Sequence, residues 1–159
     1  MDYSHAHVWH SHSEAETVRL GEQFGRHYVK RGTVVSVRGE LGAGKTHFIK
    51  GIARALGIDE RALTSPTFAL AHEFEVPAAA MHGQTNPERL FHLDCYRFER
   101  PKELLELGIE DYLYPQQAAT IIEWPERIEA YLPATAVDVE IRPTSETSRE
   151  LLIRESEKA

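Results

Sequence analysis

Short runs of apolar residues, separated by turn residues, divide this 159-residue chain into alternating helices and strands. After Ser13, a residue type favoured at helix N-caps, apolar side chains recur at helical spacing and predict a helix over about 14–30. A β-branched run predicts a buried strand at 33–37, and apolar positions at 48–56 predict a second helix, which Gly57 ends. The first half of the chain therefore contains a strand that is followed by a loop and a helix.

The second half alternates in the same way, and we predict a single domain over residues 1–159. The periodic segments predict strands at 68–74, 89–95 and 118–122, short helices at 101–107 and 110–114, a further helical stretch near 128–132, and a terminal antiparallel hairpin of strands at 137–141 and 149–154. Residues 75–88 have no hydrophobic period and contain two prolines, so a surface loop is predicted there.

A phosphate-binding motif lies between the strand at 33–37 and the helix that follows it. Eight residues match the P-loop pattern G-x-x-x-x-G-K-[ST] in full, namely Gly39, Glu40, Leu41, Gly42, Ala43, Gly44, Lys45 and Thr46. Glycines let backbone N–H groups point toward a polyphosphate, and the next helix presents its positive N-terminal end to the same anion. Lys45 can reach the β- and γ-phosphates and the Thr46 hydroxyl can ligate magnesium, so the motif predicts a site for a magnesium–nucleoside triphosphate complex.

Two acidic residues stand at the ends of predicted strands, where a P-loop protein needs a carboxylate for magnesium. Asp94 comes after the alternating segment at 89–93, and Glu123 comes after the apolar segment at 118–122. P-loop enzymes supply an Asp from the end of a second strand, and ligands of open α/β sheets bind beyond the carboxyl ends of the strands. Asp94 is therefore a predicted magnesium ligand. The alternative interpretation is that Asp94 merely begins a turn. Glu123 either holds magnesium or positions the attacking water, unless it is a surface acid.

Strand, P-loop and helix in this order predict an α/β fold of the P-loop NTPase type. The expected architecture is a mostly parallel central sheet flanked by helices, with the antiparallel hairpin at its C-terminal end. The segment at 118–122 is apolar on both faces, as expected for a central strand.

Composition and charge limit the class of protein, the binding partners and the cellular location that are expected for such a site. Hydrophobic residues make up 42% and charged residues 27% of the chain, as in ordinary globular domains. The net charge of −7 disfavours direct binding of a nucleic acid, because phosphate contacts come from Lys and Arg. The single cysteine cannot form an internal disulfide, and the sequence has neither a signal peptide nor an apolar run of roughly 20 residues, so a cytoplasmic location without a membrane partner is expected.

The first twelve residues contain four histidines, His5, His7, His10 and His12. Alternate spacing places the first two on one face of a strand and the last two on the other. They could form a metal site, but no cysteine or carboxylate cluster accompanies them. A polar, His-rich leader over 1–12 or an early edge strand is therefore the favoured interpretation.

Four motifs in a fixed order point to one protein family. They are the P-loop at 39–46, Ser65-Pro66-Thr67-Phe68, His92-Leu93-Asp94-Cys95-Tyr96-Arg97, and Ile122-Glu123-Trp124-Pro125-Glu126-Arg127, with Glu106-Leu107-Gly108 between the last two. This set resembles the bacterial TsaE family, the small P-loop ATPases of tRNA threonylcarbamoyladenosine biosynthesis, over about residues 13–142. A P-loop alone is common to many families, whereas the ordered set is specific.

The resemblance implies a role for each matched residue. Thr67 would lie in a switch-like segment near the γ-phosphate and act in catalysis together with Lys45. Asp94 would be the Walker-B-like acid that holds magnesium, and Glu123 would be a second acid at both the magnesium and the catalytic water. Trp124 would lie beside the site. On the residues alone, Thr67 could instead cap a turn, and Trp124 could be a core aromatic residue.

The resemblance also implies cofactors and partners. The cofactors are ATP and Mg²⁺, and the partners are TsaB-like and TsaD-like proteins, which in this family transfer a threonylcarbamoyl group to adenosine 37 of tRNA. ATP hydrolysis would support turnover of that assembly, and the chain would meet tRNA only indirectly through it.

The chain departs from the family pattern at a few positions. Family members often have Asp where Glu40 stands, Leu where Cys95 stands and Thr where Ala69 stands. None of these changes removes a phosphate or magnesium group. Tyr96 and Arg97 are further site candidates. The alternative for Tyr96 is an aromatic residue of the core, and the alternative for Arg97 is a surface cation.

Other classes of nucleotide-binding protein remain as alternatives. A small-molecule P-loop kinase would need an acceptor pocket and an Arg-bearing lid, and no clear lid is recognisable in the sequence. A GTPase is disfavoured because the guanine-reading pattern Asn-Lys-x-Asp is missing. A non-catalytic nucleotide-binding adaptor would bind ATP without turnover.

Overall fold

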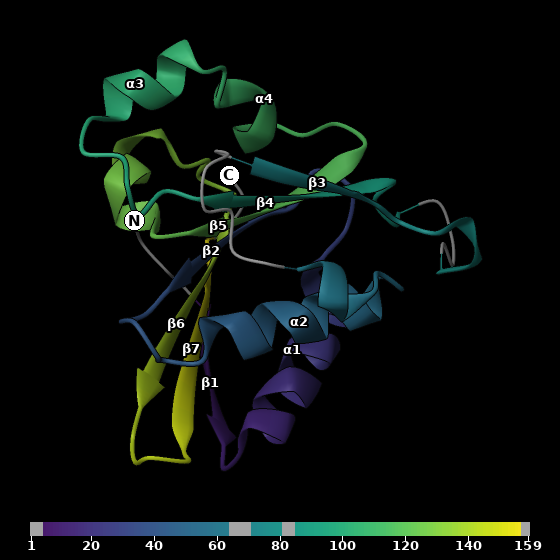
Figure 1. Ribbon diagram of the computed structural model, residues 1–159, viewed down its shortest axis with the longest axis vertical. Coiled ribbons are helices and arrows are strands. Elements are labelled where there is room, and N and C mark those ends of the chain that lie inside the picture. The colour runs from purple at the N-terminus through teal and green to yellow at the C-terminus, as the bar shows by residue number, and fades with distance from the viewer. Residues whose placement is uncertain (1–4, 64–70, 81–84, 157–159) are drawn as a thin grey trace.

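A seven-stranded sheet with helices on both faces forms the framework of the protein, as the computed structural model shows for residues 5–63, 71–80 and 85–156 (Figure 1). The strands are β1 (His5–Ser11), β2 (Val34–Arg38), β3 (Ala71–Glu75), β4 (Arg89–Asp94), β5 (Ala118–Glu123), β6 (Val137–Pro143) and β7 (Arg149–Glu155). The α-helices are α1 (Glu14–Tyr28), α2 (Lys45–Ala55), α3 (Pro101–Glu106) and α4 (Glu110–Leu113), and the 3-10 helices are η1 (Glu60–Ala62), η2 (Ala78–Ala80) and η3 (Pro125–Tyr131).

The strand order across the sheet is β1-β7-β6-β2-β5-β4-β3, and its centre is parallel. The strands β6, β2, β5 and β4 run in one direction, whereas β1 with β7, β6 with β7 and β3 with β4 pair antiparallel. The predicted α/β fold, parallel centre and C-terminal hairpin are confirmed. The sheet as a whole is mixed, because connections such as the turn at 144–148 are too short for the crossover that a parallel pair needs.

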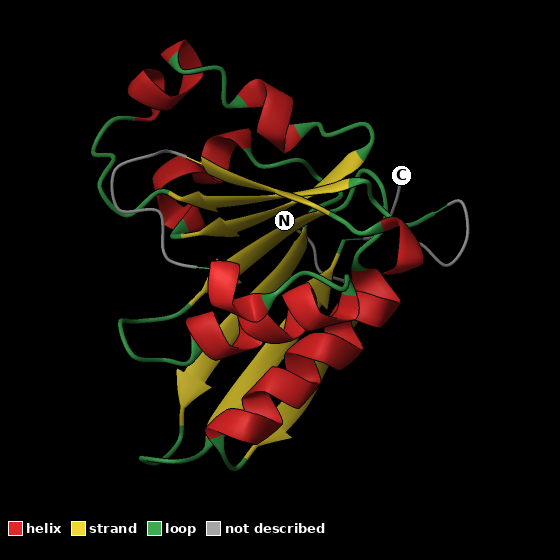
Figure 2. Cartoon of the chain, turned by 45° about the vertical axis from the view of Figure 1, so that its right-hand side comes forward, coloured by secondary structure: helices red, strands yellow, loops and turns green. Residues whose placement is uncertain are grey.

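The alternation of side chains along β2 creates two cores, one on each face of the sheet. Val35 and Val37 pack with α1 and α2, whereas Val34 packs on the opposite face with α3, α4 and η3. Figure 2 shows α1 and α2 lying together across one face, with α3, α4 and η3 beyond the other. None of the helices within the described ranges is long and apolar enough to cross a membrane.

Helices α1 and α2 approach so closely that two positions require glycine. A Cβ atom at Gly21 would lie 2.1 Å from the carbonyl oxygen of Phe48, and one at Gly51 would lie 2.0 Å from that of Val18. Both distances are far below van der Waals contact, so any side chain would push the helices apart. The close packing holds α2, and with it the P-loop at the start of α2, against α1.

Most predicted elements agree with the observed ones to within a few residues. Ser13 caps α1, since its Oγ accepts a hydrogen bond from the N–H of Glu16 at 3.0 Å. The predicted central strand is β5, which is buried along its whole length. The helical stretch expected near 128–132 is the 3-10 helix η3, which begins earlier and is kinked at Ile128. Residues 68–70 of the strand predicted at 68–74 lie outside the described residues.

Two segments that the sequence left loosely defined have definite places in the fold. Residues 5–11 form the edge strand β1, which pairs with β7. Among the residues that the structure describes, no group of three or more His, Cys, Asp or Glu side chains could hold a metal ion. Within the predicted loop at 75–88, η2 forms, and Val76 and Pro87 are buried, so the loop is anchored at both ends.

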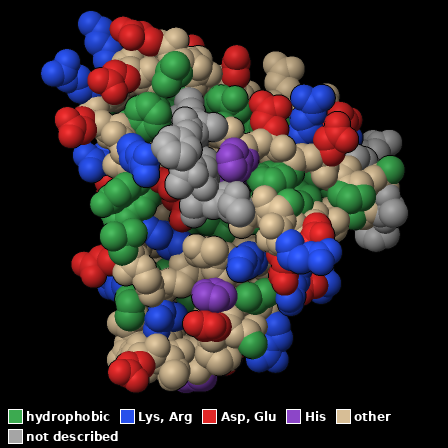
Figure 3. All heavy atoms as spheres, viewed as in Figure 1, with side chains coloured by type: hydrophobic (Ala, Val, Ile, Leu, Met, Phe, Trp, Pro, Cys, Tyr) green, Lys and Arg blue, Asp and Glu red, His purple; other side chains and the backbone are tan. Residues whose placement is uncertain are grey.

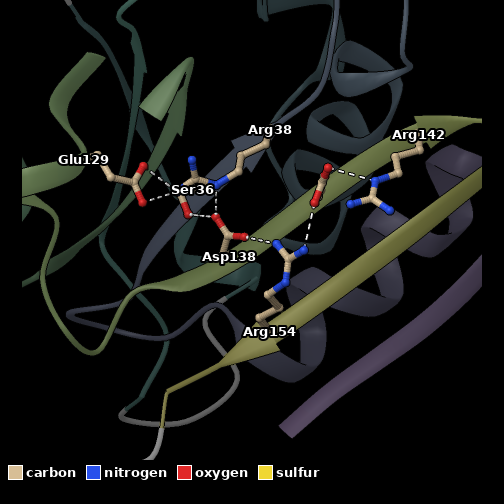
Figure 4. A network of polar contacts seen from close by, with 7 residues as sticks. Ser36, Arg38, Glu129, Asp138, Arg142 and Arg154 are labelled. Atoms are coloured by element: carbon tan, nitrogen blue, oxygen red, sulfur yellow. Dashed lines mark hydrogen bonds and ion pairs between the residues drawn. The ribbon is translucent and has the colours of Figure 1, made fainter. Parts of the chain in front are cut away.

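A buried ionic network joins three strands beneath the start of the P-loop (Figure 4). Asp138 on β6 accepts hydrogen bonds from Ser36 Oγ at 2.7 Å and from Arg38 Nε at 2.5 Å, both on β2. Arg154 on β7 donates to the other carboxylate oxygen at 2.8 Å. A buried charge is tolerated when it is paired in this way. Because Arg38 directly precedes Gly39, the network holds the strand end from which the P-loop departs.

Candidate active site

The P-loop connects β2 to α2 at the edge of the sheet where the parallel strands end. Gly42 (φ 79°) and Gly44 (φ 104°) adopt left-handed backbone conformations, which residues with a side chain disfavour. Gly44 is the N-cap of α2, so the helix begins at Lys45 and leaves the free N–H groups of its first turn at the loop. The backbone thus has the form of an anion site at a helix N-terminus.

Lys45 is buried between the P-loop and an aromatic ring. Its side-chain Nζ donates a hydrogen bond to the carbonyl oxygen of Gly39 at 2.6 Å and lies 3.9 Å from the centroid of the Trp124 ring. This second contact is a cation–π interaction. Burial lowers the pKa of Lys45, and the negative charges of neighbouring acids, Glu123 first among them, act in the opposite direction.

The two predicted acids end neighbouring parallel strands. Asp94 on β4 and Glu123 on β5 are direct partners in the register, and Glu123 is also the partner of Val37 on β2. The N–H of Tyr96 donates to Asp94 Oδ1 at 3.0 Å. Burial raises the pKa of Asp94, and this hydrogen bond opposes the rise. The parallel register therefore places both carboxyl groups beside the P-loop.

His92 is a buried partner of Glu123 to which the sequence assigned no role. Its Nε2 lies 2.7 Å from Glu123 Oε2, and because a carboxylate can only accept, the ring N–H donates. Among the described residues, His92 Nδ1 has no hydrogen-bond partner. The signal in the sequence was the alternation that puts His92 and Asp94 on one face of β4.

A cavity of about 690 Å³ lies at the P-loop and brings four parts of the chain together. These parts are the P-loop, the ends of β4 and β5, the first turn of α1 and the turn between β6 and β7. The predicted site residues that line it are Leu41, Gly42, Gly44, Lys45, Thr46, Asp94 and Glu123, together with Trp124. The sequence did not single out the lining residues Ser13, Glu14, Thr17, Glu146, Thr147 and Arg149 as part of a site.

The remaining candidates lie beside this cavity or outside the described part of the chain. Gly39, Glu40 and Ala43 belong to the P-loop without lining the cavity. The ring of Tyr96 lies 4.8 Å from that of Trp124, centroid to centroid, whereas Arg97 is exposed and does not line the cavity. Thr67 lies outside the described residues.

Trp124 itself has an uncommon backbone conformation. Among the residues that the structure describes, Trp124 is the only one other than glycine whose φ angle is positive (φ 54°, ψ 51°). A left-handed conformation costs such a residue roughly 1–2 kcal/mol, and this kind of strain gathers at functional sites. The turn that it makes after β5 brings its ring over Lys45.

We expect the fluorescence of Trp124 to report nucleotide binding, because its ring contacts the lysine of the P-loop. The chain has two tryptophans, so Trp9→Phe leaves Trp124 as the single reporter. ATP with magnesium should change the emission of this variant. The matched Trp124→Phe variant, which retains Trp9 beside Phe24 in the core, should not respond. An unchanged emission in both variants would contradict the placement of the ligand beside Trp124.

Known proteins resemble this chain over most of its length. A family model described as threonylcarbamoyl adenosine biosynthesis protein TsaE matches residues 11–151. The tRNA threonylcarbamoyladenosine biosynthesis protein TsaE of Treponema pallidum is 36% identical over 143 residues, which cover 90% of this chain and 96% of the relative. The protein of the same name from Bacillus subtilis is 35% identical over 124 residues, with coverages of 78% and 70%.

A solved structure agrees with these relatives. The crystal structure of YdiB of Bacillus subtilis matches with a TM-score of 0.70 at 27% identity, covering 96% of this chain and 87% of YdiB. The parallel-centred sheet with a P-loop between β2 and α2 defines an α/β protein with a P-loop fold. Within that class, the chain belongs to the TsaE family, and the resemblance seen in the sequence motifs is confirmed.

Proposed function

We propose that this protein binds ATP with magnesium in the cavity at the P-loop and hydrolyses it. In this proposal it is the cytoplasmic ATPase of the machinery that makes N6-threonylcarbamoyladenosine at adenosine 37 of tRNA. The observation that supports this most strongly is the convergence of Lys45, Asp94 and Glu123 on one cavity at the N-terminus of α2.

Lys45 and the first turn of α2 are the proposed binding site of the phosphates. The free N–H groups and the positive end of the helix attract an anion, and the buried ammonium group of Lys45 adds a charge-assisted contact. Burial of Lys45 strengthens its contact with the phosphates, because less water screens the charge.

Thr46, Asp94 and Glu123 are the proposed magnesium ligands. All three line the same cavity and offer oxygen atoms, which suit a magnesium ion that keeps several waters and takes one or two carboxylates. Burial disfavours the charged form of Asp94, as its raised pKa records, and a nearby cation offsets that cost. When bound, magnesium neutralises charge that develops on the transferred phosphoryl group.

Glu123 is proposed either to hold magnesium or to position the attacking water. Its Oε2 is hydrogen-bonded to His92, which restricts the rotation of the carboxylate and leaves Oε1 as the other acceptor. Holding the carboxylate in one orientation reduces the reorganisation that catalysis requires. Thr67 is proposed to act near the γ-phosphate, on the strength of the sequence motif in which it occurs.

The rest of the cavity is the proposed site of the nucleoside. Its volume is within the range of about 300–1,000 Å³ that is typical of small-molecule sites. Polar residues at the start of α1 and in the β6–β7 turn line this part, among them Ser13 and Thr147. Their hydroxyl groups can exchange hydrogen bonds with a ribose or a base.

We propose that the ATPase acts within an assembly of TsaB-like and TsaD-like proteins and meets tRNA only through it. The chain carries a net charge of −7, and Figure 3 shows acidic and basic side chains interspersed over the face in view. To bind the phosphate backbone of a tRNA without partner proteins, the chain would need a cluster of Lys and Arg side chains.

An ATPase assay with and without the two partner proteins tests this function. We expect slow hydrolysis by the isolated protein, marked stimulation by the partners, and negligible tRNA binding at physiological salt in their absence. Fast turnover without partners would indicate a stand-alone enzyme. Tight ATP binding without turnover beside the partners would indicate a non-catalytic adaptor, and transfer of phosphate to a small acceptor would indicate a kinase.

A further inference from the structure

One arginine side chain connects the P-loop to the turn between β6 and β7. Arg149, the first residue of β7, donates from Nε to the carbonyl oxygen of Ala43 at 2.8 Å and from Nη2 to that of Gly42 at 3.3 Å. Its Nη1 donates to three carbonyl oxygens of the turn, those of Ser145 (3.0 Å), Glu146 (3.4 Å) and Ser148 (2.9 Å). All three nitrogens of the guanidinium group are thus bound to backbone carbonyls of two separate segments.

The two P-loop contacts hold two peptide units. The carbonyl of Gly42 shares a unit with the N–H of Ala43, which donates to the carbonyl oxygen of Glu40 at 3.0 Å within the loop, and the carbonyl of Ala43 shares a unit with the N–H of Gly44. A peptide unit is planar and trans, so its N–H points opposite to its C=O. Holding the carbonyl of Ala43 therefore directs the N–H of Gly44 away from Arg149. A phosphate-binding loop needs this separation of carbonyls from N–H groups, because carbonyl oxygens repel the anion that N–H groups attract.

The geometry of the contact suits arginine and not lysine. The planar guanidinium presents donors in a fixed fork and can bind carbonyls of two segments at the same time. A lysine at this position would keep the positive charge beside the cavity, but its single nitrogen could not span both segments. A comparison of the two residues therefore separates the effect of charge from the effect of positioning.

We propose that Arg149 is a positioning residue for triphosphate binding. It holds the peptide unit between Ala43 and Gly44 in the orientation that leaves the Gly44 N–H for a phosphate, and it links the P-loop to the turn at 144–148, which lines the same cavity. This inference rests on the proposed function, since it assigns Arg149 a part in binding the triphosphate.

Titration calorimetry on four proteins tests the proposal. ATP and inorganic tripolyphosphate, each with magnesium, are titrated into the wild-type protein and the variants Arg149→Lys, Arg149→Ala and Arg142→Ala. Arg142 is the matched control, because it lies on the same hairpin and pairs with Glu140 at 2.8 Å without lining the cavity. We expect both Arg149 variants to bind both ligands about tenfold more weakly or worse, and Arg142→Ala to bind them normally.

Amide hydrogen exchange on the ligand-free proteins gives a second measurement that does not depend on nucleotide. In both Arg149 variants, the amide of Ala43, which donates to the carbonyl oxygen of Glu40 in the P-loop, should exchange faster, while those of the buried strand β5 should keep their wild-type rates. Unchanged rates in β5 show that the loop has loosened without unfolding of the domain.

Three results would overturn the proposal in different ways. Wild-type affinity in Arg149→Lys would show that charge alone matters at this position. Unchanged exchange at the Ala43 amide in Arg149→Ala would show that Arg149 does not hold the loop. If the wild-type protein bound neither ATP nor tripolyphosphate, the proposed function itself would fail, whatever the Arg149 variants did.

Discussion

Replacement of Asp94 by asparagine is expected to lower magnesium-dependent ATP hydrolysis by at least about 100-fold, because a metal ion contributes several kcal/mol to stabilising a phosphoryl-transfer transition state. The substitution keeps the shape of the side chain and removes its charge. Asparagine Oδ1 can still accept the hydrogen bond from the N–H of Tyr96, so the turn after β4 is preserved. The measurement is steady-state hydrolysis across a magnesium titration, in the presence of the partner proteins.

The stability of this variant should not fall together with its activity. The pKa of Asp94 is raised in the folded protein, so its charged form is less favourable there than in the unfolded chain. Above this pKa, removing the charge should leave the melting temperature unchanged or raise it. At lower pH, where Asp94 is neutral in both states, the difference between the variant and the wild-type protein should vanish.

Glu126→Gln is the matched control for Asp94→Asn. Glu126 is exposed and acts on the pKa of Lys45 through its charge, but it does not line the cavity. This variant should hydrolyse ATP at close to the wild-type rate. If Asp94→Asn also turned over normally with an unaltered magnesium titration, the ligand would be another acid, and Glu123→Gln would be the next variant.

Replacement of Lys45 by alanine is expected to weaken ATP binding by about 1.5–3 kcal/mol, which corresponds to roughly 10–150-fold. The loss has a clear physical origin, because Lys45 supplies a buried positive charge at the N-terminus of α2. Calorimetric titration of the folded variant with ATP and magnesium measures it. Unchanged affinity would rule out this lysine as a phosphate ligand.

Lys50→Ala, on the same helix, is the control for Lys45→Ala. Lys50 is partly exposed and does not line the cavity, so its removal should leave ATP affinity unchanged. The fold should survive the loss of Lys45 as well. Burial lowers the pKa of Lys45, so its charge disfavours the folded state at neutral pH, and removing it offsets the lost contacts with Gly39 and Trp124.

Local patterns in the sequence were sufficient to predict most elements of the fold. The cap at Ser13 joins residues three positions apart, and the strand before the P-loop and strand β5 are each marked by a continuous run of β-branched and apolar residues. The 3-10 character of η3, its kink at Ile128 and the left-handed backbone of Trp124 before it were missed, because no local pattern reveals them. The pairing of the His-rich β1 with β7 also depends on residues from the two ends of the chain.

The sequence by itself determined which groups are candidates for the site, since a P-loop and two strand-end acids can be recognised from spacing and residue type. The tertiary structure decided which other groups surround them. His92 meets Glu123 through the parallel register of β4 and β5. Arg149 reaches the P-loop across 106 positions of sequence. Such contacts follow from the packing of distant segments, and a pattern along one stretch of chain carries no record of them.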